Sequence, residues 1–437
     1  MIKKNTHALM QKENMEFNQD DVVLERIPNG TYQEIVDMFE RDYHFQNGER
    51  MSISNYYVKI SRSLADTFTT FIQSVIEGLE TNQFPNLPTP NGFKPNPKNL
   101  LQTELNGGFS LGSFDMAVTS EGLKNIEFQA VATYPISAAK INQYLLDKLP
   151  LDNGYIFADS PDTNWSSFIK LYETIIGGNQ KEGILLIDRK IAKQKTNFEF
   201  FATQKELDLP IEIVDMKDLF EKDKALFYTK SSNEQPQKVT RFYNRILLAE
   251  ALFEDDYPND HKMWRFRFDQ NYESLKFVNH PIKQFEVSKR LSPHLNHPFN
   301  PPCYVLSEVA QAFKNGDLNY NDYVWKHKWG AAGHRLILSP NEQILMELTP
   351  FWTDYIAQKK VNYTTFVTDD NQEKIVELRF MTAIHNKKMI IVPMARIGHA
   401  VKNQKGDTQF KIHFGDNNKE GYGFSPVIIM DKKLEEK

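Results

Sequence analysis

The sequence predicts a mixed α/β protein built from two or three packed parts. Three stretches carry this prediction: a strand hairpin over 111–133, a strand–helix–strand unit over 183–216, and a pair of long apolar strands near the C-terminus. In each stretch the apolar residues recur with the spacing of a strand or a helix, and turn residues mark the ends. A chain of 437 residues is long enough to bury more than one such core.

The composition excludes several classes of protein. Hydrophobic residues make up 40% of the chain and include 31 Phe and 18 Tyr, which indicates a globular protein with a large aromatic core. No apolar run reaches the length of a membrane span, and the N-terminus lacks the apolar core of a signal peptide, so we expect a cytoplasmic protein without a membrane partner. A single cysteine, Cys303, excludes intrachain disulfides. The net charge of −5, with both signs interspersed, does not indicate a basic surface that would bind nucleic acid.

The N-terminal region is predicted to be helical. The first twenty or so residues are polar and are expected to fray. Helical spacing of apolar residues then begins near Thr31, and a longer helical pattern runs from about Ser52 to Leu79. The aromatic faces of these two helices predict core packing. A Pro- and Asn-rich segment over 84–99 breaks the periodicity and leads into the hairpin.

The hairpin carries acidic residues on both of its strands. The Glu121–Gly122 pair supplies the turn, and the period-two rule puts Glu127 and Gln129 on one face, which Asp115 on the partner strand can share. Two carboxylates and an amide carbonyl suit Mg²⁺, which takes its remaining ligands from water and substrate phosphates. The alternative is a surface hairpin with solvated acids. A helix over 135–149 is expected to buttress the hairpin.

The next stretch predicts a βαβ unit. A buried-type strand over 183–188, a helix reaching Lys205 and a second strand over 210–216 are followed by a third strand over 238–250. Asp188 and Asp215 end the first two strands, where open α/β sheets bind ligands, although acids are also ordinary strand terminators. No Gly-rich phosphate loop follows either strand, so a Rossmann dinucleotide site is not expected.

The C-terminal third predicts two more strand pairs. A strand at 323–325, a small-residue loop from Gly330 to Gly333 and a returning strand at 336–338 would let backbone N–H groups close over phosphates, with Lys326 on the inner face. The stretches 375–384 and 388–406 are expected to pair and close the sheet, with Pro393 at an edge or a bulge.

Several of these segments resemble the eukaryotic-type glutathione synthetases and the glutathionylspermidine synthetases, which are ATP-grasp ligases. The hairpin reads D-x(11)-E-[FY]-[NQ] with Lys124 before Glu127, and Gln129 stands where the families usually have Asn. The segments FYNRI, VNHP with its following Lys289, KHKWGAAG and DYIAQKKV are similar to the substrate, phosphate and adenine segments of those families. The metal hairpin precedes the lysines, as in their circular permutation. The resemblance covers about Leu105 to the C-terminus.

The resemblance implies a role for each matching residue. It assigns Mg²⁺ to Asp115, Glu127 and Gln129. It assigns substrate orientation and oxyanion stabilisation to Arg245, Arg396 and Lys402, although Arg245 also reads as a plain surface residue on an edge strand. The positions that would bind ATP are Lys289, Lys326, Lys328, Gly330, Gly333, Ala357, Gln358, Lys359 and Lys360. For the last four, the alternative is an edge strand with solvated lysines.

The implied fold is a circularly permuted, glutathione synthetase-like ATP-grasp fold with an inserted α/β substrate subdomain. Its parts would be a helical region over 1–104, the metal hairpin and buttressing helices over 105–180, the substrate subdomain over 181–265 and the nucleotide-binding region over 266–437. These boundaries follow the motifs described above.

The implied function is an ATP-dependent ligase that joins a carboxylate to an amine through an acyl phosphate. Its substrates would be a small carboxylate and an amine or small peptide, with a homodimer as one possible assembly. The alternative is a nucleotide- or partner-binding protein that kept the fold and lost the chemistry. It is suggested by Ala331 and Ala332, which stand where the families carry an Arg-Glu pair, and by His327, which replaces their Pro.

Overall fold

A computed structural model describes most of the chain. The described residues are 21–47, 51–85, 108–131, 133–151, 153–229, 235–249, 272–330, 335–402, 408–411 and 422–431, with the backbone alone at 400–402 and 408–411. The first twenty residues, most of the Pro- and Asn-rich segment, and Gly333 with Ala331 and Ala332 lie outside the described residues, so the predictions made for them stay untested.

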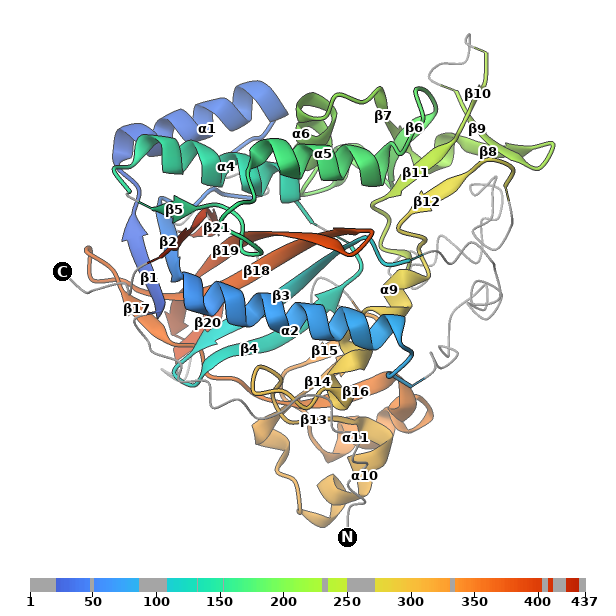
Figure 1. The fold of residues 1–437 in the computed structure, drawn as a ribbon. Helices are drawn as coiled ribbons and strands as arrows, with labels where there is room; N and C mark the ends of the chain where they lie inside the picture. Colours follow the sequence, from blue (N-terminus) through green and yellow to red (C-terminus); the bar gives the residue numbers. More distant parts are fainter. Residues whose placement is uncertain are drawn as a thin grey trace.

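A seven-stranded antiparallel sheet forms the centre of the molecule (Figure 1). Its main path runs β20-β19-β18-β3-β4, with β17 added on β18 and β21 on β19. The strands are β3 (Leu111–Thr119), β4 (Gly122–Gln129), β17 (Thr365–Val367), β18 (Glu373–His385), β19 (Lys388–Lys402), β20 (Thr408–Lys411) and β21 (Gly423–Ser425). The acidic hairpin and the C-terminal strands, which were predicted separately, therefore belong to one sheet.

Both strand pairs predicted for this sheet are confirmed. β3 and β4 form a hairpin around Ser120 and Glu121, and β18 pairs with β19 along almost its whole length. Pro393 pairs with Phe380 of β18 on one side, while on the other side its carbonyl accepts from Asn142 Nδ2 at 2.9 Å. Among the described residues, β19 therefore has a strand partner on only one side at Pro393. This position suits proline, which has no N–H to donate to a second strand.

Helices cover both faces of the central sheet. One apolar core joins it to α1 (Asn29–Tyr43), α4 (Pro135–Lys148), α5 (Trp165–Ile176) and α6 (Phe198–Glu206). The other joins it to α2 (Arg62–Glu80), where the Phe68 and Phe380 rings stack at 3.8 Å. Along β18, Met381 and Ala383 face the first core and Leu378 and Phe380 the second, which is the alternation of a strand buried on both faces. Figure 1 shows α2 crossing in front of the sheet and the other four helices above it.

The single long helix predicted over 52–79 is wrong in its first part. The structure has β2 (Tyr56–Ser61) followed by α2, whose N-cap Ser61 accepts from the Leu64 N–H. β2 lies between β1 (Val22–Arg26) and β22 (Val427–Met430), with β5 (Gly154–Tyr155) beyond β22. The aromatic and β-branched residues of β2 fit a strand, but its partners come from the two ends of the chain, which local periodicity does not reveal.

The predicted βαβ unit is confirmed. β6 (Ile184–Asp188), α6 and β7 (Ile211–Asp215) form it, and the parallel sheet has the order β12-β11-β6-β7. The third strand is shorter than predicted: β11 spans Arg241–Asn244 and pairs with β12 (Lys276–Val278). A small antiparallel sheet over β8 (Leu219–Lys222), β9 (Ala225–Tyr228) and β10 (Gln237–Lys238) extends from this unit.

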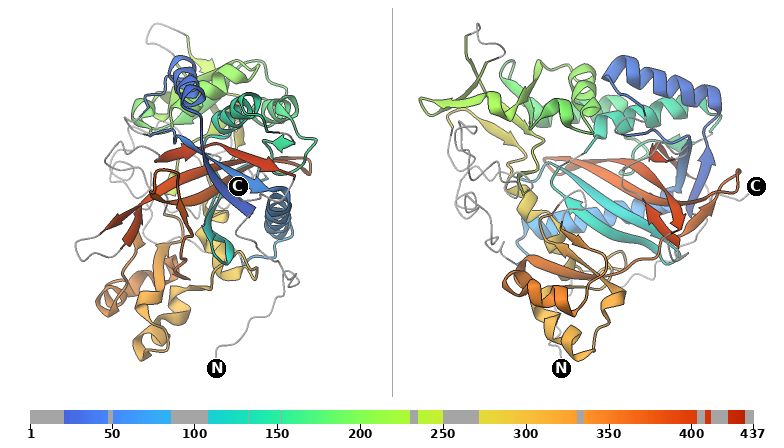
Figure 2. Two further views of the ribbon diagram at one scale, coloured as in Figure 1. Left: turned by 90° about the vertical axis from the view of Figure 1, so that its left-hand side faces the viewer. Right: turned by 180° about the vertical axis from the view of Figure 1, so that it is seen from behind.

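A small lobe lies on the other side of the central sheet from α1, α4, α5 and α6 (Figure 2). Its sheet has the order β13-β16-β14-β15, and α10 (Leu306–Asn315) and α11 (Glu342–Glu347) pack on it. The strands are β13 (Cys303–Val305), β14 (Tyr323–His327), β15 (Leu336–Ile337) and β16 (Tyr355–Lys359). Helix α9 (Lys283–Glu286) and the 3-10 helix η5 (Lys289–His294) precede the lobe in the chain. Among the described residues, no helix has the length and apolar character needed to cross a membrane.

Candidate functional site

The register of the hairpin brings its acidic residues together. Asp115 on β3 lies directly opposite Glu127 on β4, Ser113 lies opposite Gln129, and the register shifts between Asp115 and Met116. Directly opposed residues point to the same face of a sheet, so both carboxylates and the amide share one face, opposite the face that α2 covers. All nine residues of β3 are buried, which excludes the alternative of a solvated surface hairpin for this strand.

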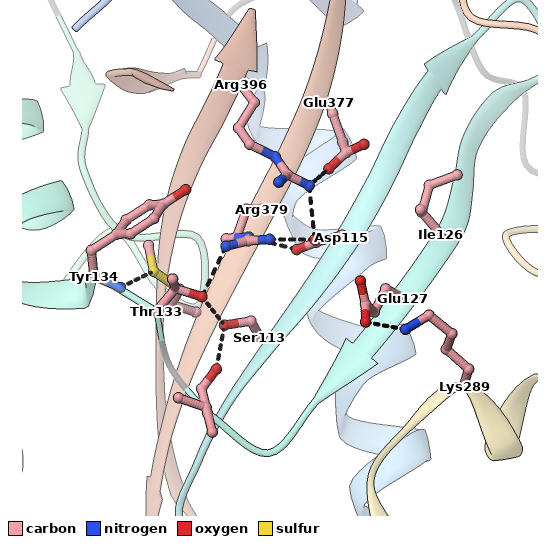
Figure 3. Close-up of polar contacts among 12 residues, drawn as sticks. Ser113, Asp115, Ile126, Glu127, Thr133, Tyr134, Lys289, Glu377, Arg379 and Arg396 are labelled. Carbon is pink, nitrogen blue, oxygen red and sulfur yellow. Dashed lines mark hydrogen bonds and ion pairs between the residues drawn. The ribbon is translucent and has the colours of Figure 1, made fainter. Parts of the chain in front are cut away.

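Asp115 is enclosed by guanidinium groups. Its side chain is 1% exposed, and Arg379 of β18 donates to both of its carboxylate oxygens, through Nε at 2.7 Å and through Nη2. Arg396 of β19 adds a contact from Nη2 at 3.0 Å (Figure 3). Burial by itself would raise the pKa of Asp115, but the two guanidinium groups outweigh it and hold the pKa below its ordinary value.

The ion pairs continue beyond Asp115. Arg396 also pairs with Glu377 of β18, whose carboxylate accepts from the Tyr363 hydroxyl at 2.9 Å. Arg379 donates from Nη1 to the Thr133 hydroxyl at 2.8 Å. Two arginines therefore balance two carboxylates in the interior. In this arrangement the oxygens of Asp115 are already used, so the structure presents Asp115 as the anchor of the two arginines and not, as expected, as a ligand open to a metal ion.

Glu127 has a different environment. It is half-buried, and the Lys289 ammonium at the start of η5 donates to its carboxylate (Figure 3). The same ammonium donates to the Gly330 carbonyl. Lys326 of β14 donates from Nζ to the carbonyl of Ile126, the residue before Glu127, at 3.0 Å. Two of the lysines expected to bind ATP thus come from separate segments and contact two adjacent residues of β4.

Lys326 and Lys328 are buried ammonium groups. Each residue is 7% exposed, and among the described residues neither has a carboxylate within ion-pair distance. Burial, reinforced by neighbouring Lys289, lowers the pKa of Lys326 to about 8, and burial likewise lowers the pKa of Lys328. Carboxylates act on both from beyond ion-pair distance, Glu127 and Asp115 on Lys326 and Asp354 and Glu308 on Lys328. A buried ammonium without a direct ion pair is costly, and a bound anion would compensate it.

A small pocket lies between the hairpin and these lysines. Glu127 and Gln129 line one side, and Lys289, Lys328 and Gly330 line the other. Its volume of about 30 Å³ has room for about one water molecule. Ligand sites usually have volumes of several hundred Å³. Gly330 therefore lies close to the hairpin in this structure, with Lys289 between them.

The strand predicted to contact adenine lies inside the sheet of the small lobe. β16 pairs with β13 on one side and with β14 on the other, and Ala357 is opposite Tyr304 and Trp325. The Lys359 N–H donates to Pro302 O and the Lys360 N–H to Asp322 O, both at 2.8 Å. The alternative of an edge strand is therefore wrong. The hydrogen bonds to β13 and β14 use the backbone groups that would contact adenine. The adenine contact therefore stays a prediction.

The other residues of this strand point in different directions. Gln358 is buried, and its amide donates to the Asn125 carbonyl of β4 at 3.2 Å. Lys359 and Lys360 are exposed. The lobe is thus tied to the hairpin at Gln358 as well as at Lys326, so β4 serves as a common wall for both.

Arg245 lies in the interior. It follows β11, is 5% exposed, donates to the Thr133 carbonyl and packs with its guanidinium carbon 5.6 Å from the Phe200 ring centroid. The alternative of a surface arginine on an edge strand is wrong, because β11 lies between β12 and β6. Thr133 accepts hydrogen bonds from both Arg245 and Arg379, so the α/β unit and the central sheet meet there. Lys402 is the last residue of β19, opposite Thr408, and its side chain lies outside the described residues.

The oxygen donors of the hairpin meet the requirements of Mg²⁺ only in part. Glu127 and Gln129 are two residues apart on one strand and both line the pocket, and Mg²⁺ in phosphate-transfer sites needs only one or two carboxylates from the protein. Among the described residues, no three His, Cys, Asp or Glu side chains form a metal cluster. The donor set fits a cation that shares its ligands with a phosphate, with Glu127 and Gln129 as the protein ligands.

Sequence reasoning missed Glu377 and Arg379. The alternation of the stretch IVELRFM puts these two residues on one face of its strand, and charged residues at such positions inside an apolar strand are a signal for a buried ion pair. Their partner could not be identified from the sequence, because β18 contacts Asp115 across the sheet from a position 264 residues away.

Comparisons with known proteins agree with this fold. No protein-family model and no curated protein matches the chain. Among solved structures, a glutathione synthetase-like effector from Globodera pallida in its apo form superposes with a TM-score of 0.50 at 11% sequence identity, over 86% of this chain and 97% of that one. At this identity the likeness concerns the fold alone. The chain therefore has a mixed α/β, glutathione synthetase-like fold.

Proposed function

We propose that this protein is an ATP-dependent ligase that joins a carboxylate to an amine and has a circularly permuted ATP-grasp fold. The observation that carries the proposal is a pair of buried lysines: Lys326 donates to the carbonyl of the residue before Glu127, and Lys328 lines the pocket that Glu127 and Gln129 also line. Anionic phosphate oxygens would compensate the lysines, and a divalent cation would bind the oxygen donors. The glutathione synthetase-like fold supports the same function.

In this proposal the lysines hold the polyphosphate. Lys289 approaches from η5, Lys326 from β14 and Lys328 from the residue after β14, so they would contact the chain of phosphates from two sides. Charge-assisted hydrogen bonds of this kind are stronger than neutral ones and strengthen further where water is excluded. Glu127 and Gln129 would hold Mg²⁺, which supplies charge neutralisation on the phosphate oxygens.

The arginines would act on the carboxylate substrate and on its acyl phosphate. Asp115 and Glu377 fix Arg396 and Arg379 on the face of the sheet that carries Glu127, so the guanidinium groups are oriented before substrate binds. A preoriented positive group stabilises the developing oxyanion when an amine attacks. Arg245 and Lys402 would orient the two substrates. Such a reaction depends on positioning and charge, and it needs no covalent participation by the protein.

A second function is a nucleotide-binding protein without ligase activity. Two observations favour it. Asp115 is neutralised by two arginines, and the pocket beside Glu127 has a volume of only about 30 Å³. The alanines at 331 and 332, in place of the Arg-Glu pair of the related ligases, point in the same direction.

One experiment separates these functions. ATP binding is measured by calorimetry and ATP consumption by phosphate release, with Mg²⁺ and a panel of amino acids and small peptides. Consumption that requires both a carboxylate and an amine supports the ligase, and binding without consumption supports the second function. Lys326→Met and Lys328→Met should both weaken binding, and Lys124→Met, which changes a hairpin lysine bonded to the Pro298 carbonyl, is the matched control. Equal ATP affinity in all four proteins would contradict the lysine site, and absence of ATP binding in the wild type would contradict both functions.

A further inference from the structure

The ammonium of Lys289 holds the candidate site closed from within. It bridges the Glu127 carboxylate on β4 and the carbonyl of Gly330 after β14. These two acceptors come from opposite walls of the pocket that also contains Gln129 and Lys328. The side chains of Lys289 and Glu127 are only 12% and 13% exposed, so the contact is shielded from water and from salt.

This contact competes with a metal ion for the same oxygens. Glu127 is the carboxylate that lines the pocket, and in the described structure its ion-pair partner is Lys289. A divalent cation arriving alone would have to bind next to the Lys289 and Lys326 ammonium groups, and like charges at such short range repel strongly. A free cation therefore has little affinity for the closed site.

A free polyphosphate meets the opposite difficulty. It would attract Lys289, but the departing ammonium would leave the Glu127 carboxylate unpaired and facing the phosphates. Removing one partner from a shielded ion pair is costly, and the phosphates add repulsion to that cost. When both ligands arrive, Lys289 and Glu127 each keep a partner, because the phosphates take Lys289 and the cation takes Glu127.

We propose that the site binds a divalent cation and a polyphosphate only together, with Lys289 exchanging from Glu127 to the phosphates. The same exchange releases the Gly330 carbonyl and so breaks the contact that Lys289 makes between Gly330 and the hairpin. The ligand class is thus the metal–nucleotide complex, not free nucleotide or free metal. This inference rests on the proposed nucleotide function, but its first test does not require a nucleotide.

The first test uses Mn²⁺ without nucleotide, followed by calorimetry. Wild-type protein should bind Mn²⁺ weakly, whereas Lys289→Met, which removes the ammonium and keeps the length of the side chain, should bind Mn²⁺ at least about tenfold more tightly. Lys289→Arg keeps the charge and should behave like wild type. The matched control is Lys283→Met, because Lys283 is an equally shielded lysine that pairs with Glu286 at 2.6 Å outside this pocket.

The second test measures the coupling between the ligands. In wild type, Mg²⁺ should tighten ATP binding at least about tenfold, and in Lys289→Met this enhancement should fall several-fold or vanish. Thermal melting of each variant shows whether it is folded. Mn²⁺ binding to wild type as tight as to Lys289→Met would overturn the exchange, as would ATP binding to wild type that is independent of Mg²⁺.

The two proposals fail in different ways. If Lys289→Met gains Mn²⁺ affinity and wild type still does not bind ATP with Mg²⁺, the competition between Lys289 and the cation stands and the nucleotide function is wrong. If wild type binds ATP and Lys289→Met gains no Mn²⁺ affinity, the nucleotide function stands and the exchange is wrong.

Discussion

Asp115 and Glu127 face each other across one rung of the hairpin, yet their surroundings differ in kind. Asp115 is fully buried and is held by two arginines that come from neighbouring strands of the same sheet. Glu127 is half-buried and is held by one lysine that comes from a separate helix. The first carboxylate is part of the sheet's interior, and the second forms a wall of a pocket.

The difference shows how the identity of the cation sets the role of an acid. Arginine presents a planar fork that binds both oxygens of a carboxylate, so the Asp115 pair is geometrically fixed and fully used. Lysine presents a single ammonium on a flexible stem, which can move to another acceptor at small cost in geometry. We therefore expect Asp115 to stabilise the fold and Glu127 to bind ligand.

The largest expected effect on stability comes from removing the negative charge of Asp115, which pairs with Arg379 and Arg396. Asp115→Asn would leave two buried guanidinium groups short of one counter-ion, which should lower the free energy of unfolding by about 3–5 kcal/mol. Urea denaturation measures this change. Glu127→Gln is the matched substitution across the rung and should lower the free energy of unfolding by less, because Glu127 is half-buried and loses one ammonium contact instead of contacts to two guanidinium groups. Equal losses in the two variants would show that the two acids do not differ as described.

Of the two acids, Glu127 should have the larger effect on ATP turnover. Glu127→Ala is expected to lower Mg²⁺-dependent ATP turnover about a hundredfold or more, because it removes the carboxylate that would hold the cation. The fold should be retained, as judged by circular dichroism. Glu121→Ala changes the exposed acid at the tip of the same hairpin and serves as the control. A turnover rate that survives in Glu127→Ala would remove the metal assignment.

Lys328 should have opposite effects on stability and on binding. Lys328→Met removes a buried ammonium that has no ion-pair partner among the described residues, so it should raise the free energy of unfolding of the ligand-free protein by about 1 kcal/mol. It should also weaken ATP binding by roughly tenfold or more. Urea denaturation measures the expected rise in unfolding free energy, and calorimetry on the same preparation measures the expected loss of ATP affinity. A loss of stability without a change in ATP affinity would assign Lys328 a structural role.

The last expected effect is a pH dependence due to Lys326. Burial lowers its pKa to about 8 in the folded state, whereas the ordinary value in the unfolded chain is 10.5. Between these values the unfolded chain binds more protons, so the penalty is full below pH 8 and fades as the pH rises towards 10.5. The stability gained by Lys326→Met over wild type should therefore shrink by about 1–2 kcal/mol between pH 7 and pH 10. A difference that stays constant with pH would contradict the buried, protonated state.

The accuracy of the sequence predictions depended on the range of the interactions involved. The hairpin, the βαβ unit and the β18–β19 pair were predicted because each is formed by nearby residues with a regular spacing. The N-terminal half of the 52–79 stretch was misassigned as helix, since β2 exists through partners at residues 22–26 and 427–430. The prediction for Ala357 and Gln358 located the strand and missed that it has neighbours on both sides.

For the site, the sequence by itself determined which side chains share a face. Alternation along β4 puts Glu127 beside Gln129, and the short turn sets Asp115 opposite Glu127, because strand period and hairpin register are local properties of the chain. Only the tertiary structure decided what each acid faces. Arg379, Arg396 and Lys289 come from positions 162 to 281 residues away. Since Coulomb interactions depend on distance in space and on burial, the division between a structural carboxylate and a ligand-binding one arises only when these segments pack together.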